Sequence, residues 1–335
     1  MKLKNILVAL AASALVATAA YAQKFDDGQN IATEAALKGK KVAFVPLSMG
    51  IDLTQAWAAA LQSDADQYGY ELSVRDPNWD VAAGAQAITQ LIADKPDVLI
   101  IHPLDMTAYS RLVTQANKAG IAVVQINLKS LNTGDAYVGV DWFDLFTKEI
   151  EAAATVCGKG TGRSGKIALL QGTPTTPTVM IGMEGVKSAL LQHPELTVVA
   201  TQSADWDATK AHTITSTILK QNPDLCAIIG FWDNQDIGAA AAIEEAGLKG
   251  QVHIISDGGS AQAAACDNIA NGNFYAYVGY NAKEQGRDLA LAVRLLLQNP
   301  PTEPGSQPFA FYSNISVLTK ENLKPDSCWS TVDVN

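Results

Sequence analysis

Aromatic and acidic side chains follow several short apolar segments, at positions where they are not needed to build a core. Trp206 and Trp232 lie beside aspartates, and Asn127, Asp257 and Tyr280 occupy comparable places. Indole and phenol rings pack on the C–H faces of a sugar ring, whereas carboxylate and amide groups bond its hydroxyls. These residue types therefore indicate a site for a small polyhydroxylated molecule. The alternative interpretation is that either tryptophan fills the interior of a domain, as large aromatic side chains often do.

Patterns typical of catalysis are weak by comparison. The sequence contains no HExxH or GxSxG pattern, and His193 and His212 fall on the surfaces of expected helices. The glycine-rich stretch 158–165 precedes an apolar segment, whereas a phosphate-binding loop joins a strand to a helix. No CxxC pair occurs, and no histidine lies close to a cysteine, as a zinc site would need. We therefore expect no catalytic residues, no metal site and no cofactor.

The first 22 residues predict export. Lys2 and Lys4 precede the apolar run 6–20, and Ala20-Tyr21-Ala22 fits a cleavage site between small residues. The alternative, an anchoring transmembrane helix, needs about 20 apolar residues, which is more than this run provides. We therefore expect a signal peptide over 1–22, removal before Gln23, and a periplasmic protein.

Charge excludes one class of partner. The chain has 24 Lys and Arg against 34 Asp and Glu, and a net charge of −10. Loss of Lys2 and Lys4 with the leader would make the charge −12. Because such a chain repels phosphate backbones, we expect no nucleic-acid partner.

Four cysteines, Cys157, Cys226, Cys266 and Cys328, suit an exported protein with disulfide bonds. An even number allows all of them to pair, although buried free thiols are the alternative. Four cysteines can pair in three ways, and their spacing does not select one of them.

Apolar segments rich in Val and Ile alternate with segments of helical periodicity, twice in succession. The expected strands are 42–47, 71–75, 97–101, 121–126, 166–170, 196–200, 225–229 and 252–256, with extra extended segments at 135–140 and 274–280. The expected helices are 54–68, 81–93, 105–119, 179–191, 209–220, 235–246 and 261–270. Such alternation is typical of parallel sheets covered by helices on both faces. The sequence therefore predicts an α/β protein with two doubly wound lobes.

Ligands of open parallel sheets bind outside the carboxyl ends of the strands. If two such sheets face each other, the loops after their strands line one cleft. Asp52 and Thr54 follow the first expected strand, where the simpler interpretation is that one of them caps the next helix.

In this order, the segments resemble the periplasmic sugar-binding proteins of the ribose-binding type, from about Lys40 to Lys320. The matching pieces include 42–46, 97–103, 120–124, 182–185, 204–207, 237–240 and 255–258. The resemblance implies a type I periplasmic binding fold, with two lobes joined by a three-segment hinge. It places 40–128 and 283–310 in the N-terminal lobe, and 131–279 and 316–335 in the C-terminal lobe. The hinge segments are expected near 127–132, 280–282 and 311–316. All four cysteines then fall in the second lobe, and the preferred pairs are Cys157 with Cys226 and Cys266 with Cys328.

By position, the resemblance places ligand contacts on the loops at the strand ends. The implied set is Asp52, Leu53, Thr54, Asn127, Met180, Trp206, Trp232, Asp257 and Tyr280. Met180 and Leu128 stand where the ribose binders place arginines, and Trp232 replaces a polar amide. The pocket is therefore expected to be more aromatic and less cationic than that of the ribose type.

The resemblance implies the substrate-binding component of an ABC importer. It would act as a monomer that closes around a sugar or polyol and docks on the importer's permease. One alternative keeps the fold but makes the protein a ligand sensor for a chemoreceptor or sensor kinase. Another is an exported hydrolase that uses Asp52 and Asp257 as a pair of carboxylates across the cleft.

Overall fold

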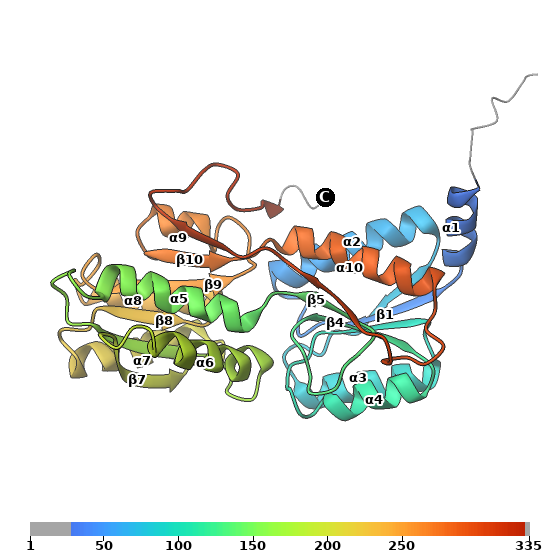
Figure 1. Cartoon of the computed structure of the whole chain (residues 1–335), viewed down its shortest axis with the longest axis horizontal. Coiled ribbons are helices and arrows are strands. Elements are labelled where there is room, and N and C mark those ends of the chain that lie inside the picture. Colours follow the sequence, from blue (N-terminus) through green and yellow to red (C-terminus); the bar gives the residue numbers. More distant parts are fainter. Residues whose placement is uncertain (1–27, 332–335) are drawn as a thin grey trace, which may run out of the picture.

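The computed structural model describes residues 28–331 and shows two α/β lobes side by side, linked by chain segments that run between them (Figure 1). The expected signal peptide over 1–22 lies outside the described residues. Within residues 28–331, no helix is both long and apolar enough to span a bilayer.

The first lobe is built on a six-stranded parallel sheet in the order β11-β5-β4-β3-β1-β2. Its strands are β1 (Lys41–Val45), β2 (Glu71–Val74), β3 (Val98–Ile101), β4 (Ala122–Asn127), β5 (Ala136–Gly139) and β11 (Phe309–Tyr312). Its helices are α1 (Gln29–Leu37), α2 (Asp52–Tyr68), α3 (Val81–Asp94), α4 (Ser110–Lys118) and α10 (Ala282–Gln298). Helices α2 and α10 cover one face of the sheet, and α3 and α4 cover the other (Figure 1).

The second lobe repeats this plan with the sheet order β12-β10-β9-β8-β6-β7. Its strands are β6 (Lys166–Gln171), β7 (Thr197–Ser203), β8 (Ala227–Gly230), β9 (His253–Gly258), β10 (Ala276–Gly279) and β12 (Ser316–Thr319). Its helices are α5 (Trp142–Cys157), α6 (Pro177–Leu190), α7 (Ala208–Gln221), α8 (Asp233–Glu245) and α9 (Cys266–Ala270). The edge strand β12 pairs antiparallel with β10, whereas the other pairs are parallel.

Central strands of both sheets are apolar without interruption because helices cover both of their faces. Every residue of β3 is buried, and so is every residue of β8. Helix α2 buries Trp57 and Leu61 on the side that faces the sheet and α10. The alternation seen in the sequence therefore gives two doubly wound lobes, as expected.

One boundary between the lobes differs from the expectation. Strand β5 lies within the segment that was assigned to the second lobe, yet it pairs in parallel with β4 of the first sheet. The loop before β5 returns along β4, and the Asp135 carboxylate fixes it by accepting a hydrogen bond from Val123 N at 2.8 Å. The buried apolar strand thereby completes the first sheet, so the chain first crosses after β5. The other two crossings lie between β10 and α10 and between β11 and β12.

Both disulfide bonds lie in the second lobe, with the expected pairing. Cys157 at the end of α5 bonds Cys226 just before β8, and Cys266 at the start of α9 bonds Cys328 in the C-terminal tail. The Cα–Cα distances are 5.9 and 6.0 Å. Beside the second bond, Trp329 Nε1 donates to Gly259 O at 2.8 Å, which ties the tail to the loop that follows β9.

Candidate ligand-binding site

The loops at the carboxyl ends of both sheets meet around one cavity, which is where open parallel sheets bind their ligands. The space in and at the mouth of the cavity, part of it open to solvent, amounts to about 520 Å³. Its wall combines leucines of the first lobe with aromatic side chains of both lobes. The lobes also touch beside it, where Met106 N donates to Thr175 O at 3.2 Å.

Six of the nine expected ligand contacts line this cavity together. They are Leu53, Asn127, Trp206, Trp232, Asp257 and Tyr280. Leu53 lies in the first turn of α2, and each of the others belongs to a loop or strand end at the carboxyl edge of its sheet, which is the position that made it a candidate. Neither Trp206 nor Trp232 is buried inside its own lobe, so the interpretation of these residues as interior packing is wrong.

The other three expected contacts do not line the cavity. Asp52 begins α2, and its Oδ2 accepts a hydrogen bond from Ala261 N of the second lobe at 2.7 Å. Thr54 is buried, and its hydroxyl donates to Ser48 O and Ile51 O. These two side chains are engaged by the protein itself. The hydrolase alternative therefore loses the second carboxylate that it needs on the cavity wall.

Met180, the third of them, lies on α6 with a side chain 45% exposed. It does not belong to the cavity wall. On α2, by contrast, Leu53 lines the cavity although its neighbours Asp52 and Thr54 do not. Helix geometry explains the difference among these three residues, because consecutive residues of a helix point in different directions.

Three indoles form a connected group at the cavity. The ring centroids of Trp206 and Trp232 are 6.2 Å apart, with the rings nearly perpendicular, and those of Trp79 and Trp232 are 5.8 Å apart. Trp79 comes from the first lobe, so the group bridges the two lobes. Edge-to-face and tilted arrangements of this kind are favourable for aromatic pairs.

Trp79 was missed in the sequence, although a signal for it existed. It follows β2 in the turn 75–80, so the rule that selected tryptophans at strand ends also applies to it. Trp142 and His102 line the cavity as well and were not selected. Trp142 starts α5, a helix that the sequence analysis did not include.

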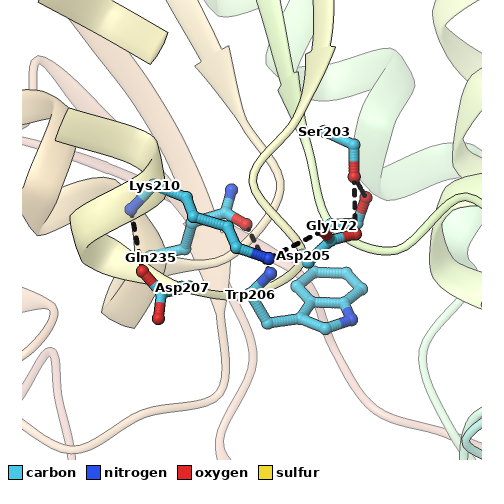
Figure 2. Close-up of polar contacts among 7 residues, drawn as sticks. All are labelled: Gly172, Ser203, Asp205, Trp206, Asp207, Lys210 and Gln235. Atoms are coloured by element: carbon cyan, nitrogen blue, oxygen red, sulfur yellow. Dashed lines mark hydrogen bonds and ion pairs between the residues drawn. The ribbon is translucent and has the colours of Figure 1, made fainter. Parts of the chain in front are cut away.

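Local backbone geometry holds Trp206 toward the cavity (Figure 2). Asp205 and Trp206 both adopt left-handed conformations, with φ of 51° and 67°. Trp206 N donates to Gln235 Oε1 at 2.9 Å, and the Asp205 carboxylate accepts from Ser203 Oγ and Lys210 Nζ (Figure 2). The indole lies against Gly172, where a Cβ atom would come within 2.1 Å of the ring. The loop therefore presents the indole in one fixed orientation.

Asn127 is likewise held in a left-handed conformation, with φ of 61°. Its carbonyl oxygen accepts hydrogen bonds from Tyr137 Oη at 2.8 Å and Trp142 Nε1 at 2.7 Å. Its side-chain Oδ1 is buried and has no hydrogen-bond partner within residues 28–331. Because an unpaired buried acceptor is costly, this oxygen suits a hydrogen-bond donor of a ligand.

Asp257 belongs to a buried group of carboxyls with Asp233, Asp236 and Glu149. Burial raises the pKa of Asp233 to about 7 and that of Asp236 to about 8. Burial, and then the neighbouring acids, raise the pKa of Asp257 and of Glu149 well above their ordinary values. Asp233 accepts from Tyr277 Oη and Ser260 Oγ, whereas Asp257 Oδ2 has no partner within residues 28–331.

His102 is a neutral group on the cavity wall. Burial lowers its pKa to about 3. Its ring meets Trp57 edge-on with centroids 5.1 Å apart, and neither ring nitrogen has a hydrogen-bond partner within residues 28–331. The buried neutral ring carries one donor and one acceptor without a charge.

The arrangement is suited to binding. The residues that line the cavity combine aromatic rings with a few buried polar atoms that have no hydrogen-bond partner within residues 28–331, namely Asn127 Oδ1, Asp257 Oδ2 and the His102 nitrogens. Small-molecule sites typically have this composition. Residues 28–331 contain no group of three or more His, Cys, Asp or Glu placed to hold a metal ion.

Known proteins share both sequence and fold with this chain. The chain is 29% identical over 199 residues to the ribose import binding protein of Salmonella typhimurium, an alignment that covers 59% of this chain and 66% of that protein. It is 30% identical over 187 residues to the ribose import binding protein of Bacillus subtilis, covering 56% and 60%. The chain thus spans less than two thirds of the length of these curated relatives.

Solved structures match over more of the chain. A periplasmic solute-binding protein of an ABC transporter from Actinobacillus succinogenes, with bound D-allose, has a TM-score of 0.71 and 25% identity, and the match covers 84% of this chain and 98% of that one. A solute-binding protein from Burkholderia graminis in complex with D-arabinose shares the fold, with a TM-score of 0.75 at 19% identity and coverage of 86% and 98%.

The family described as "Periplasmic binding protein domain" matches residues 42–301. With that match spanning most of its length, the chain belongs to the periplasmic binding protein domain family.

Proposed function

We propose that this protein is the periplasmic substrate-binding component of an ABC importer, and that it binds a sugar or polyol between its lobes. The observation that carries this function is the cavity itself. Indole rings and unpaired acceptors meet there from the carboxyl ends of two facing sheets. The curated relatives named as ribose import binding proteins, and the solved relative with bound D-allose, support this function.

Ligand binding would act by shifting the population of lobe arrangements. A ligand that touches both walls binds the closed form better than the open form, and so favours closure. Each lobe supplies residues for such contacts. The first lobe contributes Trp79 and Asn127, and the second contributes Trp206 and Trp232. The closed shape would then be the form that the permease recognises. We expect the exported protein to act as a monomer, which size-exclusion chromatography with light scattering measures directly.

A thermal-shift screen of the mature chain tests the function, since a ligand that binds only the folded state raises the melting temperature. The screen uses aldoses, ketoses, deoxy sugars and cyclic polyols, and titration calorimetry then gives the affinity of each ligand found. We expect Trp232→Ala to weaken that binding more than about tenfold, because the indole face is lost. Leu191→Ala, at an exposed position away from the cavity, is the control and should keep the affinity. Equal affinity in both variants would remove the cavity assignment.

A further inference from the structure

The cavity wall carries one carboxyl group and several aromatic rings, but no cationic side chain among the described residues. Among the described residues that line it there is no Lys or Arg, and His102 is neutral. Lys129 lies nearby in sequence, but its Nζ sits 4.0 Å from the centre of the Tyr137 ring and donates to Tyr312 Oη at 2.6 Å. The described cavity wall therefore offers no cationic side chain that would pair with a carboxylate or phosphate of a ligand.

The carboxyls behind this wall lack a counter-charge. Both carboxylate oxygens of Glu149, Oδ1 of Asp236 and Oδ2 of Asp257 are buried without a hydrogen-bond partner within residues 28–331. Buried ionised carboxylates are stable only when they are paired with a cation or a strong donor. Of these three residues, Asp257 alone lines the cavity. A ligand is thus the group that can reach it.

The indoles add a second, independent attraction for positive charge. Trp79, Trp206 and Trp232 form a connected group with centroids 5.8 and 6.2 Å apart. The face of an indole attracts a cation within about 6 Å of its centre more strongly than any other side-chain ring does. Neutral sugars also pack on such rings, so the rings alone do not select a cation. The rings together with the unpaired Asp257 do so.

Two unpaired acceptors further define the cation. Asn127 Oδ1 and Asp257 Oδ2 both need donors. A primary ammonium carries three N–H donors, whereas a quaternary ammonium carries none and would leave both oxygens unpaired. Resting on the proposed function, we infer that the ligand is a small polyol with a primary ammonium group, such as an amino sugar or amino alcohol, and that its ammonium binds Asp257.

This assignment requires a proton to move. In the ligand-free protein Asp257 holds its proton, because it faces Glu149 on α5, Asp233 and Asp236 on α8, and Tyr277 and Tyr280, all of which are acids or neutral. On binding, the Asp257 O–H bond breaks, the proton leaves to solvent, and the carboxylate pairs with the ligand's ammonium. As long as the ligand is an ammonium ion, amine binding should therefore release up to one proton and become tighter as pH rises from 5 to about 7.

Matched ligands test the inference on the mature chain. The probes are D-glucosamine, D-galactosamine and D-mannosamine, each compared with its neutral parent sugar and its N-acetyl derivative, with ethanolamine and choline added. We expect at least one amine to bind about tenfold or more tighter than its neutral counterparts, and choline to bind more weakly than ethanolamine. Calorimetry in buffers of different ionisation enthalpy should show proton release for that amine only.

Each result decides between the proposals. If neutral sugars or polyols bind as tightly as the amines, or more tightly, the inference is wrong and the importer proposal stands. If no probe and no compound of the wider screen binds, both fail. Asp257→Asn should remove the preference for the amine and the proton release. If that variant does not fold, Glu149→Gln is used instead, because it leaves the cavity wall intact, and it should reduce the proton release. Unchanged proton release in a folded form of either variant overturns the inference.

Discussion

The first lobe contributes mainly leucines to the cavity, with Trp79, His102 and Asn127, whereas the second lobe contributes Trp206, Trp232 and Asp257. The second lobe also holds both disulfides and the group of four buried carboxyls formed by Glu149, Asp233, Asp236 and Asp257, whereas the first lobe buries only the carboxyl of Asp135 among the described residues. The same architecture thus carries different chemistry on its two sides. From this difference we expect the disulfide-bonded second lobe to bind the ligand first and the first lobe to close over it.

Removing a disulfide bond of the second lobe should have the largest effect on stability. The loop closed by Cys157–Cys226 spans 69 residues. By loop entropy, Cys157→Ala with Cys226→Ala should lower the free energy of unfolding by roughly 4 kcal/mol. Hydrogen exchange should increase in α5 and β8 while β1 and β3 keep their protection. Equal loss of protection in both lobes would contradict the asymmetry, and Leu191→Ala serves as the control.

The next largest effect should be a difference in binding free energy between tryptophan substitutions on the two walls of the cavity. Trp206 is fixed by Gln235 and Gly172, whereas Trp79 is 37% exposed. If the ligand binds the second lobe first, Trp206→Ala should cost about 2–3 kcal/mol of binding free energy and Trp79→Ala about 1 kcal/mol. Calorimetry gives both values. A larger loss with Trp79→Ala would reverse the roles of the lobes.

The buried carboxyls should make stability depend on pH. Burial raises the pKa of Asp236 from 3.8 to about 8, so the folded state binds its proton more tightly than the unfolded state does. Its contribution to stability is therefore complete below pH 4 and is lost as pH rises toward 8. Asp236→Asn should raise stability at pH 8 by about 1–3 kcal/mol relative to pH 5. Denaturant titrations at both pH values measure this, and Asp224→Asn, an exposed acid of the same lobe, should show no such gain.

The contact between the lobes should have the smallest effect. Asp52 Oδ2 accepts from Ala261 N and joins α2 to the loop after β9. Asp52→Ala should weaken ligand binding by about 1 kcal/mol, because one hydrogen bond to a charged group of the closed form is lost. Stopped-flow kinetics should assign the change to faster dissociation. A change confined to the association rate would show that Asp52 acts before closure.

Much of the fold was readable from the sequence because buried parallel strands form continuous apolar runs. The same runs marked the strand ends, and so found Asn127, Trp206, Trp232, Asp257 and Tyr280. The predicted helix 261–270 begins only at Cys266, since the preceding residues form turns.

What the sequence did not reveal depends on tertiary contacts. Strand β5 was assigned to the wrong lobe because an apolar strand fits either sheet, and only the return of the loop before it along β4 decides. The engagement of Asp52 by Ala261 joins residues far apart in the chain. The orientation of Met180 away from the cavity depends on how α6 is rotated about its axis, which residue spacing alone did not fix.

The bond from Trp329 to Gly259 has a consequence for how the site is made. The end of β9 supplies Asp257 and Gly258 to the cavity, and Gly259, which begins the following loop, is held by Trp329, 70 positions later and next to the Cys266–Cys328 bridge. A chain that leaves a translocation channel with its N-terminus first would therefore fold both sheets' central strands well before this loop is secured. Ligand recognition would mature last, only after the tail has emerged and its cysteine has been oxidised.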